Sequence, residues 1–128
     1  MLHKQLTAYL AEVEAAVKQH TDAYVERYEE EILTSERINL RLRIRFASGY
    51  LLEVSEAVVV TGNVLHSLGY RYHCQDVNRT LAFRYDDTPH FPDLASFPHH
   101  QHLPDQVVSA DKPALMRVIE EAAMLGRP

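Results

Sequence analysis

Polar and apolar residues alternate without interruption from residue 37 to residue 46. The apolar positions of this segment are Ile38, Leu40, Leu42, Ile44 and Phe46. The positions between them are Arg37, Asn39, Arg41, Arg43 and Arg45. Because successive side chains of a β-strand point to opposite faces, this pattern predicts a strand with one buried and one polar face.

Further strands are predicted on the C-terminal side of this segment. We expect them at 50–60, 64–76 and 80–86, joined by turns at 47–50, 61–63 and 76–79. A glycine within the third of the four strands, Gly69, indicates a bulge. Strands of this length with such short connections predict an antiparallel meander.

The chain begins and ends with helical patterns. Apolar residues recur every three or four positions between Leu2 and Gln19, which predicts an amphipathic helix there. A second amphipathic helix is predicted over 111–125, with Asp111 as its N-cap, Pro113 in its first turn and Gly126 as its stop.

Two segments are harder to interpret. Residues 23–33 fit either an extension of the first helix or an acidic edge strand, and we prefer the strand. Its apolar residues are expected to be partly buried: Tyr24, Val25, Tyr28, Ile32 and Leu33. Residues 87–106 contain four prolines, which break helices and strand ladders, so about twenty residues without regular structure are predicted there.

These elements predict an α+β fold. It consists of an N-terminal helix, an antiparallel β-meander of four to five strands, a Pro/His-rich loop and a C-terminal helix. A chain of 128 residues fits a single domain, spanning 1–128.

Composition bears on the location and the binding partners of this domain. Cys74 is the single cysteine, so an internal disulfide is excluded and a reducing, cytoplasmic location is expected. An apolar run long enough to cross a membrane does not occur in the sequence. The net charge is −5, yet residues 37–86 hold seven arginines against four acids. An acidic protein with an arginine-rich middle is a poor general coat for nucleic acid but can hold a local anion site.

The alternation of side chains along each predicted strand places polar residues of segment 37–86 on one face of the sheet. This face is predicted to show Arg41, Arg43, Arg45, Glu53, Arg71, His73 and Arg84. One interpretation is a solvated outer face of an antiparallel sheet. The other is an RNA or phosphate site, in which arginines hold the anion and His73 transfers a proton.

Three histidines lie within four positions of the Pro/His-rich loop: His99, His100 and His102. With His90 and nearby carboxylates they could bind a metal, but the spacing matches neither usual zinc pattern, so no metal ligand and no cofactor is assigned. Histidine titrates near neutral pH and can act as general acid or base in RNA cleavage. Both uses of the cluster stay open.

Residues 70–102 resemble the signature block of the TumE family of prokaryotic toxins. That family reads Y-x-Y-H-x-Q-D, then L-x-F-R-x-D-N, P-H-H-P and F-P-H-H-K-H. The matching residues are Tyr70, Tyr72, His73, Gln75, Asp76, Leu81, Phe83, Arg84, Asp86, Pro89, His90, Phe97, Pro98, His99, His100 and His102. The chain departs from the pattern at Asp87, Phe91 and Gln101.

The resemblance implies a toxin neutralised by a cognate antitoxin, often a helix-turn-helix protein. Our leading hypothesis is a metal-independent endoribonuclease, ribosome-dependent or not, with RNA or the ribosome as target and a homodimer as a possible state. Its proton-transfer groups would be His73 and one of His99, His100 and His102. The phosphate ligands would be Arg41, Arg43, Arg71 and Arg84, with supporting roles for Tyr72, Gln75, Asp76, Asp86 and His90.

Two other functions remain open from the sequence. The first is a non-enzymatic binding module whose Pro/His-rich loop docks a partner protein. The second is a metal-dependent hydrolase that uses the histidine cluster.

Overall fold

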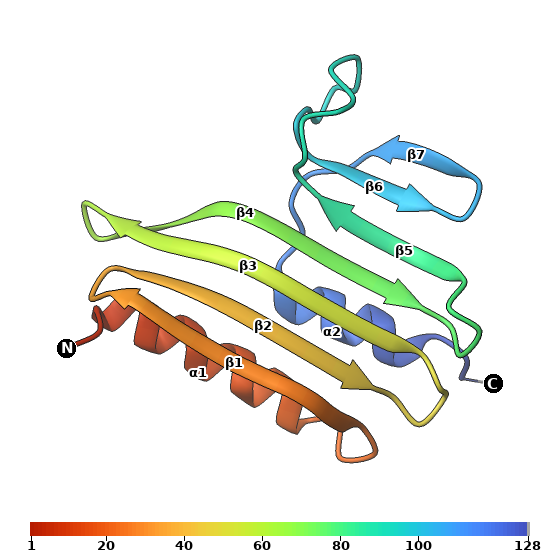
Figure 1. Ribbon diagram of the computed structural model, residues 1–128, viewed down its shortest axis with the longest axis horizontal. Helices are drawn as coiled ribbons and strands as arrows, with labels where there is room; N and C mark the ends of the chain where they lie inside the picture. The colour runs from red at the N-terminus through yellow and green to blue at the C-terminus, as the bar shows by residue number, and fades with distance from the viewer. Residues whose placement is uncertain (128) are drawn as a thin grey trace.

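A seven-stranded antiparallel sheet carries both helices on one of its faces (Figure 1). The computed structural model describes residues 1–127. The strands lie in the order of the sequence, from β1 to β7. The elements are α1 (Lys4–Lys18), β1 (Tyr24–Thr34), β2 (Arg37–Arg45), β3 (Leu51–Thr61), β4 (Val64–Gln75), β5 (Leu81–Asp86), β6 (His100–Leu103), β7 (Gln106–Ser109) and α2 (Leu115–Met124).

The predicted α+β class and the meander are confirmed, but the sheet has seven strands instead of four to five. Of the two additional strands, β6 lies in the segment 87–106 that was predicted to lack regular structure, and β7 begins at the last residue of that segment. Pro98 precedes β6, and Pro104 lies in the turn between β6 and β7. Proline is compatible with these positions because it interrupts no ladder hydrogen bond there.

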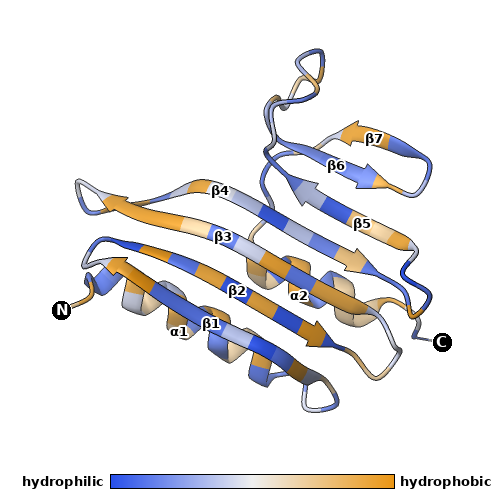
Figure 2. Cartoon of the chain, viewed as in Figure 1, coloured by the Kyte–Doolittle hydropathy of each residue, from blue (hydrophilic) through white to orange (hydrophobic). Residues whose placement is uncertain are grey.

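The alternation along β2 separates the two faces of the sheet (Figure 2). Its apolar side chains are buried in one core with those of α1 and α2. The core residues of the helices are Leu6, Leu10, Val13, Val17, Leu115, Val118, Ile119, Ala122 and Ala123. The opposite face of the sheet, here called the open face, carries the arginines of β2.

The N-terminal edge strand β1 confirms the preferred interpretation of residues 23–33. The expected burial of its apolar residues is wrong except at Tyr28, because Tyr24, Val25, Ile32 and Leu33 are exposed. The pairing of β1 with β2 shifts register near both ends of β1, and such irregularities bend an edge strand away from a regular ladder.

Two local predictions are refined by the structure. Ala57 pairs with Gly69 and Val58 pairs with Ser67, so β4 does contain a bulge, at Leu68 beside Gly69. The predicted N-cap at Asp111 is wrong, because α2 begins at Leu115. Pro113 disfavours helical backbone at the residue before it, and Ala114 is itself extended, so the helix starts only afterwards.

Within residues 1–127, the structure contains no helix that is both long and apolar enough to span a membrane.

Candidate functional site

Two rows of polar side chains cross the open face, one residue from each of five neighbouring strands. The strand register aligns Arg43, Glu53, His73, Arg84 and His102, here called the central row. The same register aligns Arg41, Ser55, Arg71, Asp86 and His100, here called the flanking row. Residues directly opposite each other on adjacent strands project to the same face, so the register brings distant parts of the sequence together.

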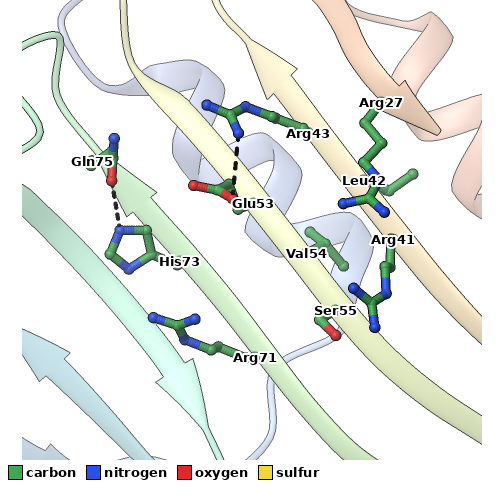
Figure 3. Close-up of a pocket in the computed structure, with 10 residues that line it drawn as sticks. All are labelled: Arg27, Arg41, Leu42, Arg43, Glu53, Val54, Ser55, Arg71, His73 and Gln75. Carbon is green, nitrogen blue, oxygen red and sulfur yellow. Dashed lines mark hydrogen bonds and ion pairs between the residues drawn. The ribbon is translucent and has the colours of Figure 1, made fainter. Parts of the chain in front are cut away.

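A hollow of about 470 Å³ lies over the centre of the open face (Figure 3). Four arginines contribute to its lining: Arg27, Arg41, Arg43 and Arg71. Glu53, His73 and Gln75 also line it, from β3 and β4. The hollow therefore combines guanidinium groups with one imidazole at a solvent-accessible surface.

The arginines of this surface differ in their ion pairs. Arg43 lies 2.9 Å from a carboxylate oxygen of Glu26 and 3.9 Å from one of Glu53. Among residues 1–127, neither Arg41, Arg71 nor Arg84 has a carboxylate oxygen within 4.0 Å. These three guanidinium groups are the ones with charge available for an incoming anion.

His73 is held by hydrogen bonds at both ring nitrogens. Its Nε2 lies 2.9 Å from Oε1 of Gln75, and its Nδ1 accepts a hydrogen bond of 3.1 Å from Nε of Arg84. Since an amide oxygen only accepts, Nε2 bears the hydrogen. Burial lowers the pKa of His73, and the positive charges of Arg84 and Arg71 lower it further. This imidazole is consequently neutral at pH 7 and has a basic nitrogen directed at Arg84.

The three histidines of the loop segment occupy different environments. His99 stacks on Tyr70, whose hydroxyl lies 2.9 Å from Nδ1 of His99, so this histidine contacts a core residue. His100 is buried, and its Nδ1 donates a hydrogen bond of 2.9 Å to the carbonyl oxygen of Pro98. His102 alone is directly paired with Arg84 in the central row.

Asp86, His100 and His102 form a compact group where β5 and β6 meet. Oδ1 of Asp86 lies 2.9 Å from Nε2 of His100, and Oδ2 lies 3.4 Å from Nε2 of His102. The two Nε2 atoms are 3.1 Å apart. Burial lowers the pKa of His102, although the charge of Asp86 opposes that effect. These side chains are of types that bind divalent metals.

Several other predicted site residues lie away from the open face or have local structural contacts. Tyr72 is buried on the helix side, where its hydroxyl donates a hydrogen bond of 2.5 Å to Glu56. Asp76 accepts hydrogen bonds from the backbone of Asn78 and Thr80 and thereby stabilises the turn between β4 and β5. His90 is exposed in the loop 87–99, with its ring against Phe91.

A buried polar cluster on the helix side was missed by the sequence interpretation. Glu56 is 3% exposed and contacts the hydroxyl groups of Tyr9 and Tyr72, and its Oε2 lies 3.1 Å from Nζ of Lys112. The signal was present, because Glu56 falls on the apolar parity of its strand. A carboxylate buried in a core needs donors around it, and here α1, β4 and the connection between β7 and α2 supply them.

Comparison with known proteins adds one finding to this geometry. A family model described as Toxin TumE matches residues 13–124 of the chain. The search of curated proteins and the search of solved structures both give no match. The matched range includes the central row and the flanking row in full.

Proposed function

The chain belongs to the TumE family of toxins, and we propose that it binds and cleaves RNA on the open face of its sheet. A member of this family is the toxin of a toxin–antitoxin pair, so its partner is a cognate antitoxin. The observation that carries the proposal is the contact between a neutral His73 and Arg84, next to Arg41 and Arg71, which are likewise without carboxylate partners among residues 1–127.

The arginines would bind the RNA backbone. Guanidinium groups form paired hydrogen bonds with phosphate oxygens, and those of Arg41, Arg71 and Arg84 lie on three different strands. An anion that enters the hollow meets the guanidinium groups of Arg41 and Arg71 together with the imidazole of His73, which contacts Arg84 beside the hollow. Arg43 would contribute less than the sequence predicted, because Glu26 already binds its guanidinium group.

The reaction that fits these groups is transfer within the RNA itself. His73 accepts the proton of a 2′-hydroxyl at Nδ1, the 2′-oxygen bonds to the adjacent phosphorus, and the bond from phosphorus to the 5′-oxygen breaks. A general acid protonates the leaving 5′-oxygen, and we assign this role to the protonated form of His102, whose Nδ1 lacks a hydrogen-bond partner among residues 1–127 and whose Nε2 faces the carboxylate of Asp86.

The bond between Arg84 and His73 would control when the base is available. Without RNA, the Nδ1 lone pair of His73 accepts the Nε hydrogen of Arg84. A phosphate that binds Arg84 draws this hydrogen away, which frees the lone pair beside the substrate. The same guanidinium group then stabilises the charge that develops on phosphorus oxygens in the transition state.

The test is cleavage of RNA by the purified full chain, with and without ribosomes. We expect fragments with 2′,3′-cyclic phosphate ends, and these fragments should disappear when the antitoxin is added. RNA that stays intact under both conditions, while the protein still binds its antitoxin, contradicts the proposal. That result would favour the second candidate, a docking module, for which the support is the projecting loop 87–99 with its exposed Phe97 (Figure 1).

A further inference from the structure

The side chains of Asp86, His100 and His102 converge, and we propose that they bind a divalent transition-metal ion of the Zn²⁺ class. The spacing of the histidines in the sequence did not indicate a metal site. It is the pairing of β5 with β6 that brings Asp86 opposite His100 and places His102 two residues further along the same face. This inference does not rest on the proposed ribonuclease reaction, although both use His102. An ion on Nε2 of His102 would replace the proton that the acid role requires, so the reaction is assigned to the metal-free chain.

The distances between the converging atoms fit a common ion. Nε2 of His100 lies 2.9 Å from Oδ1 of Asp86 and 3.1 Å from Nε2 of His102, which in turn lies 3.4 Å from the other carboxylate oxygen, Oδ2. One ligand atom from each of the three residues lies within 4.8 Å of the other two. An ion about 2.1 Å from each ligand atom keeps neighbouring ligands about 3.4 Å apart in tetrahedral geometry and about 3.0 Å apart in octahedral geometry. Adjustments of the side chains would therefore place one ligand atom of each residue within bonding distance of one ion.

The hydrogen bond at the far side of His100 prepares it as a ligand. The carbonyl oxygen of Pro98 only accepts, so Nδ1 of His100 bears a hydrogen. In the neutral ring the lone pair is then on Nε2, which lies 2.9 Å from Oδ1 of Asp86. Histidines that bind metals commonly donate their other ring N–H to a backbone carbonyl or a carboxylate in this way. A cation between Nε2 and the carboxylate satisfies the lone pairs on both sides.

The surroundings of the three side chains favour retention of an ion. The exposed fractions are 1% for His100, 6% for Asp86 and 22% for His102. The ring of Phe91 contacts both imidazoles edge to face, with centroids 4.9 Å from His100 and 5.8 Å from His102. Three protein ligands with one partly exposed member leave a coordination position for a further ligand.

The ion would also join the two ends of the loop 87–99. Asp86 is the last residue of β5, whereas His100 and His102 belong to β6. Among residues 1–127, this is the one group of three such side chains whose ligand atoms converge. Neither His90 nor His99 belongs to it, which provides matched controls within the same histidine-rich segment.

The experiment measures metal binding directly on the untagged full chain, dialysed free of metal. Calorimetric titration should show one equivalent of Zn²⁺ bound per chain. Addition of Co²⁺ should give the visible absorption of an ion bound by imidazole. His102→Gln and Asp86→Asn should each weaken Zn²⁺ binding by more than the roughly 10- to 100-fold loss that is typical when a hydrogen-bond partner of a metal ligand is removed. His99→Gln should leave the affinity unchanged.

Three results would overturn the inference. The first is less than a tenth of an equivalent of Zn²⁺ bound by the wild-type chain. The second is an equal loss of affinity in His99→Gln and His102→Gln, which would indicate adventitious binding by a histidine-rich surface. The third, decisive even if the variants fail to fold, is a Co²⁺ spectrum of the hydrated ion. Because RNA is not involved, failure of the ribonuclease proposal cannot produce any of these results.

Discussion

Arg84 donates a hydrogen bond of 3.1 Å from its Nε to Nδ1 of His73, across the neighbouring strands β5 and β4. The bond links a permanent positive charge to a neutral imidazole at the centre of the open face. On the other side of Arg84, the same strand register places His102. The candidate base, phosphate ligand and acid are thus consecutive members of the central row.

Replacement of His73 should abolish toxicity without unfolding the protein. We expect His73→Gln to lower the rate of RNA cleavage by about 10²- to 10⁴-fold, because the variant lacks the base. The rate is measured on the purified chain, and growth arrest is measured on induction without the antitoxin. His66→Gln, an exposed change on the same strand, serves as the control. Full toxicity of a folded His73→Gln protein would remove His73 from the mechanism.

The lowered pKa of His73 predicts how stability changes with pH. Burial, Arg84 and Arg71 lower the pKa in the folded chain, whereas Gln75 and the charge of Glu53 raise it. The unfolded chain therefore binds a proton here at higher pH than the folded chain does. The contribution of His73 to the free energy of unfolding is present above the ordinary pKa of 6.5 and falls as the pH drops below it.

Urea unfolding at several pH values between 7 and 5 measures this effect. The free energy of unfolding should decrease more steeply with falling pH in the wild type than in His73→Gln, which lacks the titrating group. Parallel decreases in the two proteins would show that His73 has the same pKa in the folded and unfolded chains.

Loss of Arg71 should weaken RNA binding in a salt-dependent way. Each phosphate contact to a single strand contributes about −0.7 to the slope of log K against log salt. Arg71→Gln should therefore bind a labelled single-stranded RNA less tightly at low salt and with a slope shallower by about 0.7. Fluorescence anisotropy measures both quantities. Arg117→Gln on α2 is the matched control, and an equal loss there would argue against a binding site on the open face.

Removal of a hydroxyl next to Glu56 should destabilise the fold. Tyr72→Phe deletes the donor of the 2.5 Å hydrogen bond and leaves the buried carboxylate less satisfied, at a cost of about 1–3 kcal/mol in the free energy of unfolding. Chemical denaturation measures this cost. Tyr85→Phe is the control, because the hydroxyl of Tyr85 contacts the exposed Glu121 and its loss should change stability little. Equal costs for both variants would show that the buried cluster contributes no special stability.

The strand pattern was readable from the sequence because strand geometry is local. The alternation from Ile38 to Phe46 fixes which side chains of β2 face the helices, and it needs no knowledge of the neighbouring strands. The same parity correctly placed Arg71 and His73 together on β4. The hairpin of β6 and β7 was missed, although Pro104 and Asp105 between two short segments form a typical turn signal.

What the sequence by itself determined is the α+β class, the order of β1 to β5 and the polar face on which the site residues lie. The tertiary structure alone decided that His102 neighbours Arg84, that His100 meets Asp86, and that His99 contacts Tyr70. These contacts depend on how β6 pairs with β5 across the loop 87–99. A strand register set over such a distance follows from packing and hydrogen bonding of the whole sheet, which a local pattern of residues does not specify.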